Sequence, residues 1–171
     1  IYAGSLLIAR ATARAVLRQR PALVSIVAMG SQGKVRTDED EQCALYIRNL
    51  LEGRKPEPAA LRSLVASGGE TAKFDDPEQP QYHPEDRDRA LQVDAVDFAI
   101  EVERVEGLLV ALCRDLRFLE PQRIHAPGAH IHLAAFGFRL ANIRQGRRQV
   151  RLCLLVAFLG TAQFGSHLVD T

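Results

Sequence analysis

The sequence has no tryptophan, a single methionine, and only three cysteines, which are odd in number and far apart (Cys43, Cys113 and Cys153). This spacing lacks the close pairs of zinc and redox motifs, so we expect free thiols in a reducing compartment, the cytoplasm. Charge of one sign is also missing. A formal net charge of +1 gives no electrostatic reason to expect a nucleic acid partner.

Long hydrophobic runs are absent as well. The longest apolar run, Leu152 to Gly160, is too short to span a bilayer, and no signal peptide is visible, so we expect no membrane partner. The composition that is present, 47% hydrophobic and 25% charged over 171 residues, suits one globular domain with a core. Because Ile1 leads at once into an organised segment, we expect a fragment of a longer domain.

Helical and strand patterns alternate over the first half of the chain. We expect a helix over Leu6 to Gln19, ended by Pro21, and then a strand over Leu23 to Met29 that is covered on both faces of a parallel sheet. A second helix is expected to start after Thr37 and to end at Gly53. Its buried stripe is predicted to contain Cys43, Ile47, Leu50 and Leu51.

The next segment predicts two short helices and a hairpin. The helices are expected over Ala59 to Ala66 and Pro84 to Leu91, with a loop between them. Alternating apolar and acidic residues over Val96 to Glu103 predict a half-exposed strand, which turns at Glu106-Gly107 into a second strand, Leu108 to Leu112. The predicted fold class is α/β, a partly parallel sheet flanked by helices with a terminal antiparallel hairpin.

The sequence changes character near Arg114. Lysine is absent beyond this point, acids become scarce and the amphipathic pattern fades. Residues 1–113 are predicted to form the α/β domain, and residues 114–171 an unassigned extension. Within it, Ile131 to Leu140 and Val150 to Leu159 fit either strands or helices. Two origins stay open for the extension, a divergent segment and translation past a shifted reading frame.

The loop after the first buried strand is the first candidate site. Ligands of open α/β sheets bind beyond the carboxyl ends of strands, where Gly30, Gly33 and Lys34 lie. Glycines let backbone amides approach an anion, and Lys34 adds positive charge. The loop lacks the ending of a nucleotide-binding P-loop. A tight turn with solvated basic residues is an equally good interpretation.

Two helix starts supply the other candidates. Asp38, Glu39, Asp40 and Glu41 include carboxylates that suit a hard cation such as Mg²⁺. On residue types alone, however, a well-capped helix start is the better interpretation, with Thr37 and Asp40 forming a capping box. Ser5 is expected at the start of the first helix, where its hydroxyl either caps the helix or helps to bind an anion.

Several segments together resemble one family, the 2-phosphosulfolactate phosphatases. Tyr2 to Leu7 resembles the family's Ala/Gly-Ser-Leu-Leu-Asn motif, with Ile8 in place of the asparagine. Val27 to Gly30, followed by Gly33, resembles its strand and glycine loop. Thr37 to Ala44 resembles its Leu-Glu-Asp-x-x-Cys-Ala signature. The resemblance covers roughly residues 1–112 and joins several motifs in order.

The resemblance implies a Mg²⁺-dependent phosphatase. Members of the family hydrolyse 2-phospho-3-sulfolactate to sulfolactate and phosphate, a step of coenzyme M biosynthesis. By this resemblance, Glu39 and Asp40 are the catalytic and metal-binding residues, and a small anionic phosphoester is held by Ser5, Gly30, Gly33 and Lys34. A homodimer is an open possibility. The family's amino-terminal motifs have no counterpart here, so this chain alone is expected to lack half of the site and an inactive fragment stays open. A non-catalytic α/β binding or interaction domain is the alternative.

Overall fold

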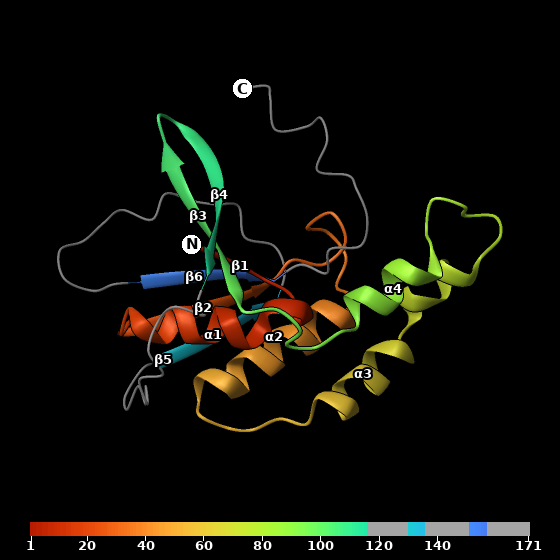
Figure 1. Cartoon of the computed structure of the whole chain (residues 1–171), viewed down its shortest axis with the longest axis horizontal. Coiled ribbons are helices and arrows are strands. Elements are labelled where there is room, and N and C mark those ends of the chain that lie inside the picture. Colours follow the sequence, from red (N-terminus) through yellow and green to blue (C-terminus); the bar gives the residue numbers. More distant parts are fainter. Residues whose placement is uncertain (116–129, 136–150, 157–171) are drawn as a thin grey trace.

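The computed structural model describes residues 1–115, 130–135 and 151–156, which form a mixed α/β fold (Figure 1). The mixed α/β class predicted from the sequence is confirmed. In chain order the elements are β1 (Tyr2–Gly4), η1 (Leu6–Ile8), α1 (Ala9–Arg18), β2 (Leu23–Ala28), α2 (Asp38–Leu51), α3 (Pro58–Ala66), η2 (Gly69–Asp75), α4 (Pro84–Ala90), β3 (Phe98–Val105), β4 (Leu108–Asp115), β5 (His130–Ala135) and β6 (Arg151–Val156).

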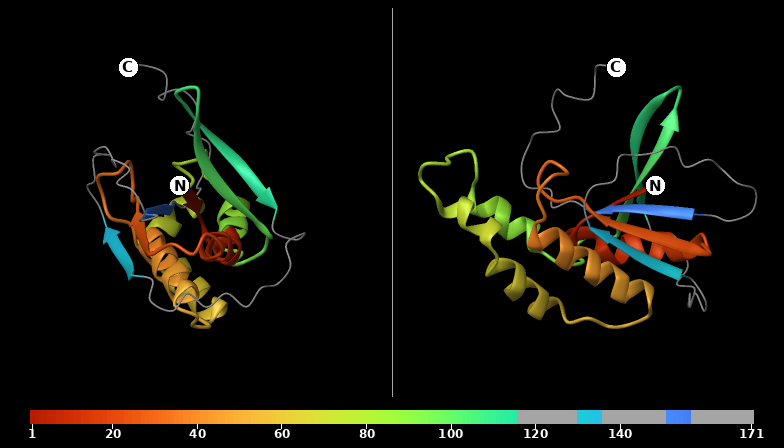
Figure 2. Two further views of the ribbon diagram at one scale, coloured as in Figure 1. Left: turned by 90° about the vertical axis from the view of Figure 1, so that its left-hand side faces the viewer. Right: turned by 180° about the vertical axis from the view of Figure 1, so that it is seen from behind.

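The described strands are ordered β4-β3-β1-β6-β2-β5. β3 and β4 form an antiparallel hairpin, and β1 pairs antiparallel with the other edge of β3, with Tyr2 opposite Glu101. The hairpin turn has positive φ at both central residues, Glu106 (50°) and Gly107 (89°). A two-residue turn of this kind matches the twist of the two strands that it connects. The predicted antiparallel hairpin is therefore confirmed, and its tip extends away from the helices (Figure 2).

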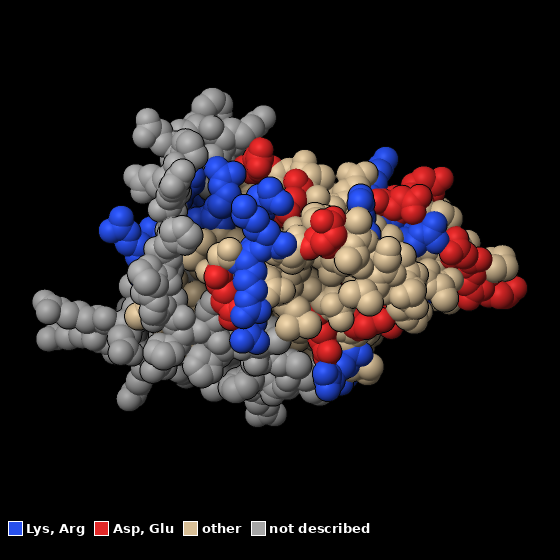
Figure 3. Space-filling view, turned by 90° about the horizontal axis from the view of Figure 1, so that it is seen from below, with Lys and Arg blue, Asp and Glu red and all other residues tan. Residues whose placement is uncertain are grey.

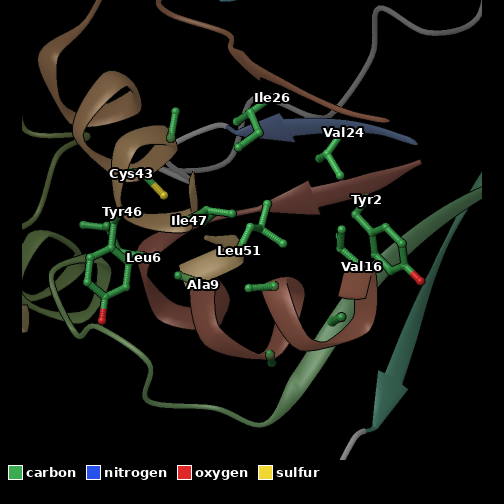
Figure 4. Packing of buried hydrophobic residues seen from close by; sticks show 14 of the residues in the cluster. Tyr2, Leu6, Ala9, Val16, Val24, Ile26, Cys43, Tyr46, Ile47 and Leu51 are labelled. Carbon is green, nitrogen blue, oxygen red and sulfur yellow. The ribbon is translucent and has the colours of Figure 1, made fainter. Parts of the chain in front are cut away.

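The core lies between β2 and the two longest helices. Val24, Ile26 and Ala28 point from β2 into a cluster that includes Val16 of α1 and Ile47 of α2 (Figure 4). The alternate residues of β2, Leu23, Ser25 and Val27, are only half-buried. The predicted strand over β2 is confirmed, but only one of its faces is fully buried, the one on which α1 and α2 pack.

Most predicted boundaries agree with the structure, but the first helix does not start where the pattern placed it. β1 and the 3₁₀ turn η1 precede α1, which begins only at Ala9. The strand forms because Tyr2 is buried beside β3, where its hydroxyl accepts a 2.7 Å hydrogen bond from Gln19 Nε2. Ser5 therefore lies at a three-residue 3₁₀ turn, and its side chain makes no capping hydrogen bond.

The chain beyond Arg114 contributes β5 and β6, which overlap the two ranges left open between strand and helix. β6 lies between β1 and β2, with Leu154 opposite both Tyr2 and Ile26. The remaining residues of those two ranges fall outside the described part of the chain. In the helices of the described residues, none combines the length and the apolar character needed to cross a membrane.

An ionic contact between a mostly exposed arginine and a largely buried aspartate links α2 to α1. Asp94, in the segment before β3, accepts hydrogen bonds from the Arg10 backbone N–H (2.7 Å) and from the Tyr46 hydroxyl (2.7 Å). Arg10 Nη2 lies 3.0 Å from the same carboxylate. Burial, helped by Asp94, raises the pKa of Tyr46 to about 12, so its proton stays in the contact at any physiological pH. The two helices are thus joined by charge-assisted hydrogen bonds as well as by packing.

Candidate functional site

The loop that follows β2 is a tight turn that closes on itself. Ser31 N–H donates to Val35 O at 2.8 Å, and the two residues form an isolated antiparallel bridge. Gly30 has φ of +65°, and a Cβ built there would lie 2.1 Å from Val35 O. Any larger residue would therefore have to displace the backbone across the turn, so the loop requires glycine at this position.

The start of α2 lies directly against this loop. The Gly30 N–H donates a 2.6 Å hydrogen bond to Asp40 Oδ2, and Asp40 is only 3% exposed. Of the residues predicted to share a site, Gly30 and Asp40 are therefore in contact. The predicted capping box is wrong in this respect: Thr37 is the N-cap residue, but its side chain makes no capping hydrogen bond, and Asp40 binds the Gly30 loop.

Glu39 is buried beside Asp40 in the first turn of α2. It is 7% exposed, and within the described part of the chain its Oε2 atom has no hydrogen-bond partner. Burial, helped by the neighbouring Asp38 carboxyl, raises the pKa of Glu39 to about 7, although its own backbone N–H and the Thr37 hydroxyl act in the opposite direction. At neutral pH this carboxyl can therefore exchange a proton, because its charged and neutral forms are close in free energy.

Asp38 belongs to the same acidic cluster, although the resemblance gave it no role in the site. Its Oδ1 accepts a 3.2 Å hydrogen bond from the Glu39 N–H, and its Oδ2 lies against Gly68, where a Cβ would be only 2.1 Å away. The turn between α3 and η2 thus touches the start of α2. The sequence marked Gly68-Gly69 only as a helix end, and no spacing signal linked it to Asp38.

The remaining predicted site residues are less closely joined. Gly33 (φ +63°) and Lys34 are exposed at the tip of the loop, and the Lys34 N–H donates to Ser31 O at 3.0 Å. Ser5 is 8% exposed, and in the described residues no hydrogen bond connects it to the loop. Lys34 is therefore the predicted residue best placed to meet an incoming anion, while Ser5 stays a separate feature.

The other cation of the loop is neutralised locally. Arg36 Nη2 donates a 3.0 Å hydrogen bond to Glu41 Oε2, and this guanidinium lowers the pKa of Glu41. Farther along α2, Glu52 pairs with Arg48 (2.9 Å) and Arg54 (2.8 Å). Figure 3 shows one face of the molecule, on which a band of basic atoms has acidic atoms beside it. Paired charges of this kind create no extended field of one sign.

The donor atoms allow only a limited metal site. In the part of the chain that the structure describes, no group of three or more His, Cys, Asp or Glu residues could hold a metal ion. Oδ2 of Asp40 is already bound to Gly30, whereas Oε2 of Glu39 is buried and has no partner among the described residues. An orphaned carboxylate oxygen fits Mg²⁺, which takes one or two protein carboxylates and keeps several waters.

The comparisons with known proteins give no family. No protein-family model matches the chain, and no curated protein and no solved structure matches it.

Proposed function

We propose that this chain contributes the Gly30 loop and the first turn of α2 to the Mg²⁺-dependent hydrolysis of a small acidic phosphomonoester in the cytoplasm. The observation that carries the proposal is the 2.6 Å hydrogen bond between the Gly30 N–H and Asp40. This hydrogen bond joins the glycine turn, which is expected to bind the phosphate, to the acidic first turn of α2, which is expected to bind the metal ion. The resemblance favours 2-phosphosulfolactate as the substrate and coenzyme M biosynthesis as the context.

The architecture proposed with this function is a partly parallel sheet whose ligand lies beyond the carboxyl end of β2. Its support is the register of β2, which runs parallel to both β5 and β6 over six residues. In open α/β sheets, bound ligands lie outside the carboxyl ends of such strands. Gly30 is two residues beyond the end of β2, so the loop occupies the position that this rule favours.

Each residue has a role set by its surroundings. Lys34, exposed at the loop tip, attracts and orients the phosphate. Asp40 holds the loop in place through Gly30, and Glu39 supplies the free carboxylate oxygen that would hold Mg²⁺. Bound there, the ion would neutralise charge on the phosphate. The reaction forms a bond from water oxygen to phosphorus and breaks the ester P–O bond, and the alcohol leaves with a proton.

A second candidate is a non-catalytic α/β binding domain. It is favoured by the burial of Asp40, which is 3% exposed and whose Oδ2 is bound to the Gly30 backbone. A carboxylate that only locks a loop needs no reaction to explain it. The two candidates differ in one measurable property, the release of phosphate.

Phosphate release separates the two candidates. The full chain is incubated with 2-phosphosulfolactate or with p-nitrophenyl phosphate, with Mg²⁺ or with EDTA. We expect release that requires Mg²⁺ and that falls at least roughly tenfold in Glu39→Gln and in Asp40→Asn. Glu52→Gln is the matched control, because it changes the same chemical group at the opposite end of α2. Absence of release from the folded chain, or full activity of Glu39→Gln, would favour the binding domain.

A further inference from the structure

β4 is an edge strand of the described sheet, and half of its backbone groups point outward. The strand order ends at β4, so within the described part of the chain only β3 pairs with it. Val102 of β3 lies opposite Ala111, and the Val102 N–H donates a 2.8 Å hydrogen bond to Ile1 O on the other side of β3. Antiparallel pairs alternate between hydrogen-bonded and non-hydrogen-bonded positions. The backbone groups of Ala111, and of Leu109 and Cys113 two residues away on either side, therefore point to the outer edge.

The side chains of β4 leave this outer edge unprotected. Edge strands are commonly protected by charged residues or by proline, but the segment from Leu108 to Cys113 contains neither. Arg114 follows this segment, and its guanidinium is bound by two carboxylates of β3, with Nε 2.9 Å from Glu101 Oε2 and Nη2 2.6 Å from Glu103 Oε1. The charge of Arg114 is therefore turned towards β3 and does not guard the outer edge.

β4 is also apolar on both faces of the hairpin. Leu108 and Leu109 are both exposed, and they lie on opposite faces because successive residues of a strand alternate. The tip that carries them extends away from the helices (Figure 2). A strand that pairs well with this edge has to be extended, uncharged and apolar on both faces. β4 of a second copy has all of these properties.

We propose that the outer edge of β4 is an interface between two copies of this chain, which pair as antiparallel strands about a two-fold axis. Leu109, Ala111 and Cys113 then exchange backbone hydrogen bonds with the same strand of the other copy, and the symmetry makes each contact twice. Two uncharged strands bring no repulsion to this contact. An interface of one strand is small, and small interfaces are typical of transient complexes. The single chain therefore predominates in dilute solution, and the pair forms as the protein concentration rises.

Sedimentation equilibrium of the full chain, over about 1 to 500 µM protein, tests the pairing. We expect the average mass to rise with concentration from that of one chain towards that of two, and to stop there because a two-fold pair is closed. An average mass that stays at one chain over the whole range would overturn the proposal. A mass that continues to rise beyond two chains would overturn it as well.

Two substitutions locate the contact on the outer edge. Ala111→Pro removes a donor that points away from β3, so the hairpin keeps its own hydrogen bonds. Because the donor is lost from both copies, the dissociation constant should rise at least about tenfold. Ala111→Ser keeps the N–H and is the matched control, which should pair as the wild type does. Leu109→Lys adds a charge to the edge without changing the backbone, and it should also weaken pairing several-fold. A pair that neither Ala111→Pro nor Leu109→Lys weakens would be joined elsewhere, and the proposal would be wrong.

Hydrogen exchange of single amides, followed by nuclear magnetic resonance, gives an independent readout. In the dilute chain the amides of Val110 and Leu112 should exchange slowly, because they donate to β3, whereas those of Leu109, Ala111 and Cys113 should exchange fast. At high concentration the second set should slow several-fold while the first set stays unchanged. Slow exchange of the second set at every concentration would mean that the chain's own residues cover this edge, which would overturn the proposal.

Discussion

Charged side chains are usually exposed and apolar ones buried, but the first turn of α2 and the tip of the β3–β4 hairpin each depart from this rule. The helix start buries charge, with Glu39 7% and Asp40 3% exposed. The hairpin tip exposes apolar side chains, with Leu108 71%, Leu109 54% and Val105 47% exposed. A buried carboxylate must find partners or change its protonation, whereas an exposed leucine needs no partner at all.

The difference shows where substitutions should matter. At the helix start, one side-chain oxygen holds the Gly30 loop in place, because the Gly30 N–H donates its hydrogen bond to Asp40. At the hairpin tip, the main fixed contacts are those of the backbone ladder, which depends little on the side chains. Charged residues should therefore contribute more to stability at the first site than leucines do at the second.

The largest effect is expected for Asp40→Ala. The change removes a charge-assisted hydrogen bond and leaves the Gly30 N–H without its acceptor, which should lower the free energy of unfolding by about 3 kcal/mol. Urea denaturation of the full chain measures it. Asp97→Ala is the control, since its carboxylate is exposed and lies 3.8 Å from Arg14, so it should cost less than about 0.5 kcal/mol. Equal effects for the two variants would contradict the buried contact.

An intermediate and pH-dependent effect is expected for Glu39. Burial raises its pKa from 4.5 to about 7, so the folded state holds a proton that the unfolded state has lost. This contribution to stability is fully present below pH 4.5 and is lost as the pH rises through 7. Relative to Glu39→Gln, which cannot ionise, the wild type should lose about 2 kcal/mol between pH 4.5 and pH 8.

This prediction is checked by urea denaturation of both proteins in EDTA across that pH range. Glu41→Gln is a useful control, because Arg36 lowers the pKa of Glu41 and its dependence on pH has the opposite sign. If the free energy of unfolding changed with pH in the same way for the wild type and Glu39→Gln, the pKa of Glu39 would not be raised in the folded state.

The smallest effect is expected at the hairpin tip. Leu108→Asn should change the free energy of unfolding by no more than about 0.5 kcal/mol, because the side chain is mostly in water in the folded and unfolded states alike. The same denaturation measurement applies. A loss above about 1 kcal/mol would mean that Leu108 is buried in solution, and the contrast with the start of α2 would fail.

Local patterns predicted many of the elements. The β-branched run before Gly30 predicted β2, the acids after Thr37 predicted the start of α2, and Glu106-Gly107 predicted the hairpin turn, all of which the structure confirms. These signals depend on residues adjacent in the chain. β1 was missed because its three residues form a strand only by pairing with β3 and β6, which lie far along the chain.

The candidate site was only partly predictable for the same reason. The proximity of Gly30 and the α2 acids follows from a strand, a short loop and a helix in sequence. The roles of the individual acids do not follow, since Asp38, Glu39 and Asp40 are alike in a helical pattern. Asp40 is distinguished by the Gly30 N–H and Asp38 by Gly68, and neither contact has a signature in the sequence.

The sequence by itself determined the local conformations, because glycine, proline, capping residues and apolar periodicity act over a few bonds. The tertiary structure alone decided which carboxylates are buried, which one holds the Gly30 loop and which one keeps a free oxygen. Burial and hydrogen bonding depend on groups brought together from distant segments, and these surroundings set the charge and the chemistry of a carboxyl group.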